Sequence, residues 1–286
     1  MAYRYFILIS YSGAAYSGWQ LQPNASTVQQ FLEKGLSVLL REITSVTGCG
    51  RTDAGVHARN YTAHFDSEIC LGEQERIQLI FKLNRFLPRD IAVHSIQPVV
   101  AGAHARFSAL WREYEYQIIT AKDPFALESA YYFHAKTDVS LMNLAAKFLL
   151  GRHDFESFSK VHTQVNNFNC NIEKAIWVKN DTKLQFTIRA DRFLRNMVRA
   201  IVGTLLDVGT GKITVDEFER IIEKRNRCEA GYSVPANGLT FTGVGYPELL
   251  YCNEPQLFLP DSSNKIISHY YTDPEFHKSS GNETNE

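Results

Sequence analysis

The sequence lacks the features that mark secreted, membrane-bound or zinc-binding proteins. Its five cysteines include no C-x-x-C pair and are odd in number, which argues against a disulfide framework or a zinc site; Cys49 is interpreted as a small core residue. No apolar run is long enough to cross a membrane, and the first ten residues do not form a signal peptide. We therefore expect a cytoplasmic protein with no membrane association and no metal site.

The sequence also lacks a strong charge of either sign. The formal net charge of the 286 residues is -1, whereas a nucleic-acid-binding protein usually has a basic surface. The segment 261–286 holds five acidic residues and two lysines, so the remainder has a net charge of +2. Any binding of nucleic acid must therefore come from local clusters of basic residues.

Hydrophobic residues make up 44% of the chain, which is enough for a sizeable core. In the first half we expect strands at 3–11, 44–49, 59–65 and 91–96, and helices at 27–41 and 73–86. In the second half we expect strands at 112–120, 171–180 and 183–190, and helices at 138–150 and 192–208.

This order of elements predicts an α+β fold with largely antiparallel sheets flanked by helices. The repeated pattern indicates two similar subdomains, an N-terminal one at 1–105 and a C-terminal one at 106–260. The remaining residues, 261–286, form a polar tail that we expect to be partly disordered.

The segment Gly50–Ala58, G-R-T-D-A-G-V-H-A, places one carboxylate, Asp53, between an arginine and two glycines. A Gly-rich segment between strands is usually a turn in which an aspartate bonds to the backbone. Over all nine positions, however, this string resembles the catalytic loop of the tRNA pseudouridine synthase A family. The resemblance implies that Asp53 is the catalytic carboxylate and that Arg51 fills the gap left by a flipped base. His57 either braces this loop or contacts RNA.

Three arginines, Arg192, Arg195 and Arg199, share one face of the helix expected at 192–208, opposite its apolar residues. On periodicity alone, a solvated cationic face is the simpler interpretation. The string F-L-R-N-M-V-R-A-I-V-G at 193–203 nevertheless resembles the family segment whose last arginine, here Arg199, pairs with the catalytic aspartate. A guanidinium can hold a carboxylate through two parallel hydrogen bonds.

The segment R-E-Y-E-Y at 112–116 places Tyr114 and Tyr116 on one face of a strand. Two core tyrosines are the simpler interpretation, but the resemblance makes Tyr114 the residue that contacts the target base. A tyrosine ring can stack on uracil and also offers a hydroxyl.

Further segments match the family in the same order along the chain. His104 and Arg106 lie in A-H-A-R-F-S-A, which corresponds to an RNA-facing loop, and Leu239 corresponds to a residue that lines the uracil pocket. The segment 11–22 resembles an early loop that reaches toward RNA, and the polar loop 160–166 is a further expected tRNA contact.

The resemblance covers about residues 3–245. It implies a pseudouridine synthase fold with the active cleft between the two subdomains. It also implies a homodimer that isomerises uridines 38 to 40 in the anticodon stem-loop of tRNA, without a cofactor.

Pseudouridine formation breaks the bond from N1 of uracil to ribose C1′, and C5 of the same uracil then bonds to C1′. One carboxylate suffices, either by attacking C1′ or by assisting removal of the 2′ proton to give a glycal. The sequence leaves both routes open. Two rival functions are an inactive RNA-binding module of the same fold and a hydrolase that removes the base, which would need a second carboxylate near Asp53.

Overall fold

The computed structural model describes residues 1–160 and 167–258, whose strands join into one 11-stranded sheet. The main path of the sheet has the order β11-β1-β3-β10-β5-β9-β8-β7, while β2 pairs with β3, β4 with β1 and β6 with β5. The strands are β1 (Ala2–Tyr11), β2 (Val46–Gly48), β3 (His57–Ser67), β4 (Ile91–Pro98), β5 (Trp111–Ile119), β6 (Tyr131–Tyr132), β7 (Gly151–Asp154), β8 (Asn169–Asn180), β9 (Lys183–Ala190), β10 (Leu239–Gly245) and β11 (Leu257–Phe258).

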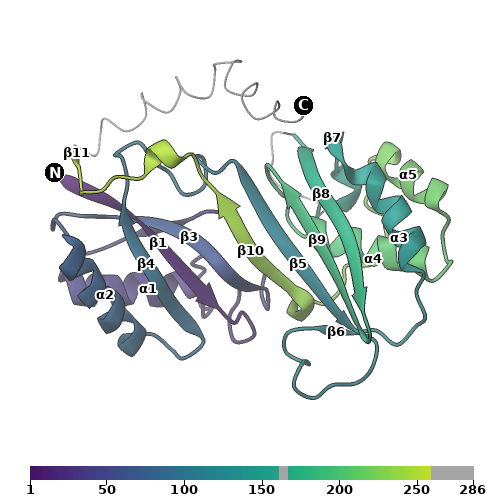
Figure 1. The fold of residues 1–286 in the computed structure, drawn as a ribbon, viewed down its shortest axis with the longest axis horizontal. Coiled ribbons are helices and arrows are strands. Elements are labelled where there is room, and N and C mark those ends of the chain that lie inside the picture. The colour runs from purple at the N-terminus through teal and green to yellow at the C-terminus, as the bar shows by residue number, and fades with distance from the viewer. Residues whose placement is uncertain (161–166, 259–286) are drawn as a thin grey trace, which may run out of the picture.

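The α-helices of the described residues fall into two groups beside this sheet. They are α1 (Val28–Leu40), α2 (Glu73–Phe86), α3 (Val139–Ala146), α4 (Met197–Gly209) and α5 (Val215–Lys224). Figure 1 shows α1 and α2 beside the half that contains β1, β3 and β4, and α3, α4 and α5 beside the half that contains β8 and β9. Short 3-10 helices are η1 (Lys147–Leu149), η2 (Glu156–Phe158), η3 (Ala236–Gly238) and η4 (Glu248–Leu250). Within the described ranges, no helix has the length and apolar character needed to cross a bilayer.

Several helices begin where side chains satisfy free backbone N–H groups. The Thr27 side chain accepts a hydrogen bond from the Gln30 N–H at the start of α1. The Asp138 carboxylate does the same for the first turn of α3. Thr214 and Glu217 form a capping box at the start of α5. Such caps contribute about 1 kcal/mol each to helix stability.

The two halves of the sheet meet at β10. This strand pairs antiparallel with β5 and parallel with β3, and the parallel contact includes only two residue pairs, one of which is Phe241 with Ala58. The Phe241 side chain is 1% exposed. Its ring lies edge-on to Tyr61, with centroids 5.3 Å apart, and to Tyr114, with centroids 5.1 Å apart. One aromatic cluster therefore bridges β3, β10 and β5.

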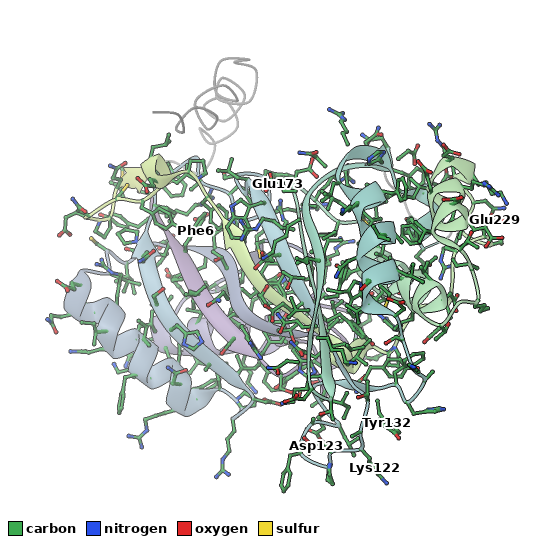
Figure 2. All side chains as sticks on the ribbon, turned by 45° about the vertical axis from the view of Figure 1, so that its right-hand side comes forward. Phe6, Lys122, Asp123, Tyr132, Glu173 and Glu229 are labelled. Carbon is green, nitrogen blue, oxygen red and sulfur yellow. The ribbon has the colours of Figure 1, made fainter. Side chains whose placement is uncertain are left out.

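The loop between β5 and β6 extends beyond the sheet edge near this seam. Figure 2 shows Lys122 and Asp123 of this loop projecting at the lower end of the molecule, where Tyr132 of β6 also lies. The loop is nonetheless tied to the body of the protein, because Asn237 Nδ2 donates to the carbonyls of Leu127 (2.8 Å) and Ala130 (2.9 Å).

The predicted α+β class with mainly antiparallel pairing is confirmed. In the structure, however, the strands form one continuous sheet rather than several. The predicted bounds of α2 and β9 agree with those found, and the turn that joins β8 to β9 contains Asp181 in a left-handed conformation. The tail at 261–286 lies outside the described residues, and the boundary between subdomains at residue 105 stays a prediction.

The helix predicted at 192–208 is wrong at its start. Helix α4 begins at Met197, because Asn196 adopts a φ of 66° that an α-helix does not continue through. Helix α5 and strand β10 are among the elements that were not predicted, together with the short strands β6, β7 and β11. The sequence of β10, L-T-F-T-G-V-G, contains two glycines, which weaken a strand pattern.

We expect Phe241→Ala to lower the free energy of unfolding by about 3–5 kcal/mol, because it leaves a cavity at the seam of the sheet. Urea unfolding of both the wild type and the variant measures this loss. Phe125→Ala is the control, since Phe125 is 98% exposed and its truncation should change stability by no more than about 0.5 kcal/mol. Similar losses in the two variants would contradict the account of the seam.

Candidate active site

Asp53 lies in the loop between β2 and β3, and this loop packs against residues 12–27. The Trp19 N–H donates to the Thr52 carbonyl at 3.3 Å. Gly18 has a φ of 92°, and a Cβ at this position would lie 2.3 Å from the Thr52 oxygen, so the close approach of the two loops requires glycine. The backbone that precedes Asp53 is therefore fixed by direct packing.

The Trp19 side chain also packs close to the Asp53 loop, through Tyr61. It is 3% exposed, and its ring centroid lies 4.4 Å from that of Tyr61. The Tyr61 hydroxyl in turn donates to the Gly50 carbonyl at the start of the loop. Trp19 is thus a packing residue, and the longest exposed run of its loop is 20–24.

His57 braces the other end of the Asp53 loop. Its Nδ1 lies 3.1 Å from the Gly13 backbone nitrogen, and its Nε2 lies 2.9 Å from the Glu128 carbonyl oxygen. Because Nδ1 faces an N–H donor, it accepts, and Nε2 carries the proton and donates to Glu128. The ring is 8% exposed. Of the two interpretations of His57, this geometry favours the loop brace over an RNA contact.

Two guanidinium groups flank the Asp53 carboxylate. Arg199 Nη1 lies 3.9 Å from Oδ2, and Arg195 Nε lies 3.7 Å from Oδ1. The structure therefore brings Arg199 and Asp53 together, but at a distance beyond that of a hydrogen bond. The two parallel hydrogen bonds expected for this pair are absent. The Asp53 side chain is 29% exposed, so a substrate can reach its oxygens.

Arg195 was not identified as a partner of Asp53 from the sequence. The predicted helix placed it on an arginine face with Arg192 and Arg199, but only Arg199 lies on α4. The left-handed turn at Asn196 separates the segment 191–196 from the helix, so helical periodicity does not describe its side chains. The Arg195 side chain is 60% exposed, compared with 21% for Arg199.

Arg199 is held by the segment 227–235, which we call the strap. The Arg199 Nε donates to the Val234 carbonyl at 2.7 Å, and the Val234 N–H donates to the Arg199 carbonyl at 3.2 Å. Another bond joins Asn196 Nδ2 to the Ser233 hydroxyl at 2.6 Å. The strap thus fixes both the start of α4 and the guanidinium that faces Asp53.

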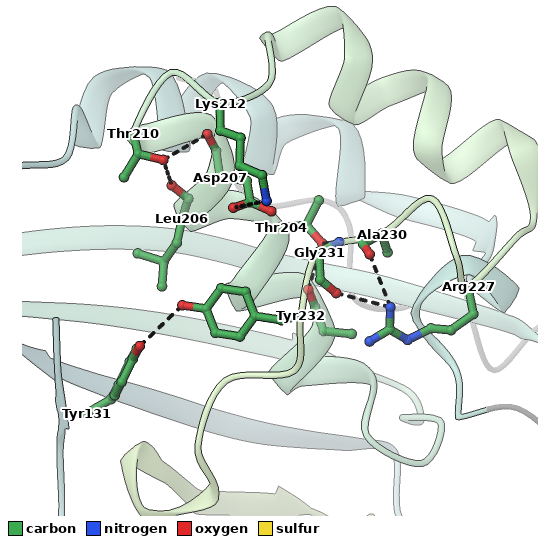
Figure 3. A network of polar contacts seen from close by, with 11 residues as sticks. Tyr131, Thr204, Leu206, Asp207, Thr210, Lys212, Arg227, Ala230, Gly231 and Tyr232 are labelled. Carbon is green, nitrogen blue, oxygen red and sulfur yellow. Dashed lines mark hydrogen bonds and ion pairs between the residues drawn. The ribbon is translucent and has the colours of Figure 1, made fainter. Parts of the chain in front are cut away.

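Figure 3 shows how the strap is attached to α4. The Gly231 N–H donates to the Thr204 hydroxyl at 2.9 Å, and Arg227 donates to the carbonyls of Ala230 and Gly231 at 3.2 and 3.0 Å. The contact is close, since a Cβ on Gly203 of α4 would lie 1.8 Å from the Tyr232 carbonyl oxygen. The helix and the strap therefore act as one rigid support for Arg199.

Tyr114 lies on β5 in an aromatic enclosure. Its ring meets Phe193 and Phe241 edge-on at centroid distances of 5.1 Å each, and it is 9% exposed. Burial raises the pKa of the Tyr114 phenol, and the neighbouring Cys49 and the Asp53 charge raise it further. The hydroxyl therefore stays protonated at neutral pH. None of the described residues hydrogen-bonds to it, so it is available to a ligand.

Tyr116 and Leu239 lie on the neighbouring strands β5 and β10. The Tyr116 side chain is fully buried and its hydroxyl donates to the Pro235 carbonyl at 2.7 Å, so it is a core residue. Leu239 opens β10 directly opposite Tyr116 and is 6% exposed. It is two residues from Phe241, which packs against Tyr114.

Four arginines form a basic cluster beside this site. Burial, together with the positive charges of Arg51, Arg112 and Arg192, lowers the pKa of Arg106. Arg51 and Arg106 are both exposed. Positive charge is therefore clustered at one place, although the net charge of the chain is close to zero. A nearly neutral chain needs such a local cluster in order to bind nucleic acid.

His104 braces the loop that carries Arg106. Its Nδ1 accepts the backbone N–H groups of Arg106 (3.1 Å) and Phe107 (3.3 Å), and its ring lies 4.7 Å from that of His64. Burial and the nearby charge of Arg4 lower the pKa of His104, so the ring is mostly neutral at pH 7. An RNA contact by His104 stays a prediction.

Three other predictions concern the surroundings of the site. Cys49 is fully buried, and burial raises the pKa of its thiol to about 12, which confirms the interpretation as a core residue. The loop at 160–166, expected to contact tRNA, lies outside the described residues from position 161 on. Within the described residues, no group of three His, Cys, Asp or Glu side chains is placed to hold a metal ion.

The fold thus brings together a carboxylate flanked by two arginines, a buried tyrosine and a basic surface. Residues 145–247 match the family model described as tRNA pseudouridine synthase. The chain is 52% identical over 248 residues to tRNA pseudouridine synthase A from Parabacteroides distasonis, covering 87% of this chain and 98% of that protein. It is 41% identical to tRNA pseudouridine synthase A from Bacillus subtilis, covering 83% and 97%.

The chain belongs to the tRNA pseudouridine synthase A family, and it is an isomerase of the pseudouridine synthase class. The resemblance seen in its motifs is therefore confirmed. Among solved structures, a chain from the "Crystal Structure of a Cbf5-Nop10-Gar1 Complex" matches at a TM-score of 0.34 and 11% identity, covering 84% of this chain and 59% of that one. That similarity is too low to add to the argument.

We expect Arg199→Ala to lower the free energy of unfolding by about 1.5–3 kcal/mol, because it removes a charge-assisted hydrogen bond to the strap. Arg195→Ala should change it by less than about 1 kcal/mol, since an exposed guanidinium contributes little. Urea unfolding of the two variants makes the comparison. Equal losses would show that the strap does not depend on Arg199.

Proposed function

We propose that this enzyme isomerises uridine to pseudouridine at positions 38 to 40 of the anticodon stem-loop of tRNA, with Asp53 as the catalytic carboxylate. The observation that carries this proposal is the placement of the Asp53 carboxylate between Arg195 and Arg199 and near Tyr114. The target positions follow from the family resemblance, and the substrate follows from the names of the relatives.

The proposed chemistry requires a carboxylate oxygen that is free to react at the ribose. Neither flanking guanidinium lies within hydrogen-bond distance of Asp53, so the arginines orient the carboxylate by charge and leave its lone pairs available. The carboxylate either attacks C1′ as a nucleophile or assists removal of the 2′ proton to form a glycal. In both routes the detached uracil turns in place and C5 then bonds to C1′, which displaces the carboxylate from C1′ in the first route and returns a proton to C2′ in the second. The proton on C5 is then lost, and N1 takes up a proton. No cofactor is required.

The target uridine must leave its stack before it can react, which costs a few kcal/mol. Arg51 is exposed and lies two residues before Asp53, so its planar guanidinium can occupy the vacated space. Tyr114 would contact the extruded base through its free hydroxyl, while Leu239 would form part of the apolar wall of the pocket. Arg106 would bind the RNA backbone, and His104 would hold its loop.

The proposed assembly is a homodimer in the cytoplasm, with one tRNA contacting both subunits. Its support is electrostatic: a chain with a net charge of -1 gains basic surface for RNA when two copies place their arginine clusters along one substrate. Within each chain, we propose that the two subdomains meet near residue 105.

The two rival functions receive no support from the structure. A base-removing hydrolase needs a second carboxylate to activate water, and the charged neighbours of Asp53 are arginines. An inactive RNA-binding module has no requirement for an accessible carboxylate between two guanidiniums.

We expect Asp53→Asn to abolish pseudouridine formation while leaving tRNA affinity and stability nearly unchanged, because the substitution keeps the shape of the side chain and removes only its charge. Tritium release from C5-labelled uridine in tRNA measures turnover. Asp181→Asn, in the turn between β8 and β9, is the control and should be fully active. Turnover above a trace level by Asp53→Asn would refute the catalytic assignment.

We expect Arg51→Ala to slow the reaction much more on a target in a base pair than on a mismatched target, since flipping costs more when the base is paired and stacked. Single-turnover rates on two tRNAs that differ only at the base opposite the target give the comparison. Arg59→Ala, an exposed arginine on β3, controls for loss of charge. Equal defects on the two substrates would assign Arg51 to general binding instead.

A further inference from the structure

Arg112 lies on β5 and donates to the backbone carbonyls of four residues. Its Nε and Nη2 lie 3.3 and 3.1 Å from the Cys49 oxygen, and Nη2 also donates to Arg106. Its Nη1 lies 3.3 Å from the Ala109 oxygen and 2.7 Å from the Asp191 oxygen. A guanidinium has five N–H groups, and all five are directed at main-chain oxygens.

The four carbonyls belong to three segments that are far apart in the sequence. Cys49 opens the loop that carries Asp53. Arg106 and Ala109 belong to the loop that is braced by His104. Asp191 opens the segment that leads through two arginines to α4. Arg112 is therefore the point at which the carboxylate loop, the basic loop and the arginine segment are joined.

The donor geometry separates Arg112 from the other members of the basic cluster. Because every N–H is used by a carbonyl, none is left to bind a phosphate. Among the described residues, no carboxylate forms an ion pair with Arg112, so its place is not set by a counter-charge. A lysine cannot replace it, since an ammonium has three donors on a flexible stem and no planar fork.

We propose that Arg112 is a positioning residue for pseudouridine formation, which aligns the three active-site segments through their backbones without contacting RNA. The proposal rests on the assignment of Asp53 as the catalytic group. Tyr114, two residues along β5, points to the same face of the sheet. The same strand would thereby set both the base contact and the frame around the carboxylate.

The test compares Arg112→Lys and Arg112→Gln with Arg189→Lys as the control. Arg189 is also fully engaged, with Glu113 at 3.0 Å and the Trp111 ring at 4.0 Å, but it lies on the opposite face of the sheet. Three quantities are measured for each protein. They are the single-turnover rate with saturating enzyme, the salt dependence of tRNA affinity, and amide hydrogen exchange.

We expect both Arg112 variants to lower the saturated rate about 10- to 100-fold, because small misplacements of reacting groups have effects of this size. Amide protection should fall in the segments around 49–56, 104–110 and 189–196 and stay normal elsewhere. The slope of affinity against salt should match that of the wild type. Arg189→Lys should show neither change.

Three results would overturn the proposal. The first is a wild-type rate for Arg112→Lys. The second is a normal saturated rate with weaker binding and a salt slope reduced by about one unit in Arg112→Gln, which indicates a phosphate contact. The third is a uniform loss of protection across the sheet, which indicates general structural support.

Asp53→Asn in the same experiments separates this proposal from the assignment on which it rests. That variant should lose turnover and keep normal protection in all three segments. If it retained turnover, the catalytic assignment would fail, whereas the positioning role of Arg112 would still be decided by its own rates and exchange pattern.

Discussion

The geometry of this enzyme depends on the short parallel contact between β10 and β3. Only two residue pairs form it, yet it brings together groups from both halves of the chain. Asp53 comes from the loop before β3, Tyr114 from β5 and Leu239 from the start of β10. The buried ring of Phe241 fills the seam between them. A change of register at this contact would shift the carboxylate relative to the tyrosine, and the packing of Tyr61 and Tyr114 against Phe241 opposes such a shift.

Charge in this molecule is organised locally and not by net composition. Arg195 and Arg199 face the Asp53 carboxylate without hydrogen-bonding to it. Arg51 and Arg106 are exposed, whereas the N–H groups of Arg112 donate hydrogen bonds to backbone carbonyls. Arginines of similar appearance in the sequence therefore have three different environments. The hydrogen-bond partners of an arginine, and not its charge alone, therefore indicate whether its guanidinium is free to contact RNA or stabilises the protein structure.

The sequence was most informative where a local string determines a local structure. The motif at 50–58 indicated the family, and α1, α2 and β9 were predicted close to their observed bounds. The sequence was least informative where tertiary packing decides the conformation. The left-handed Asn196 that starts α4 late is favoured by contacts with Ser233 of the strap, and no helical pattern reveals it. Consequently Arg195 was placed on a helix and its proximity to Asp53 was missed. The continuous sheet was also missed, because β10 contains glycines and its partner β3 is remote in sequence.

The central claim is that the fold delivers the target ribose to Asp53 and the base to Tyr114. The most direct measurement is an experimental structure of the Asp53→Asn enzyme bound to an unmodified tRNA substrate. The account predicts an extruded uridine whose C1′ or 2′ carbon lies about 3–3.5 Å from the side chain at position 53, with its base next to Tyr114 and Leu239. A uridine that remains stacked in the RNA, or one bound away from position 53, would contradict it.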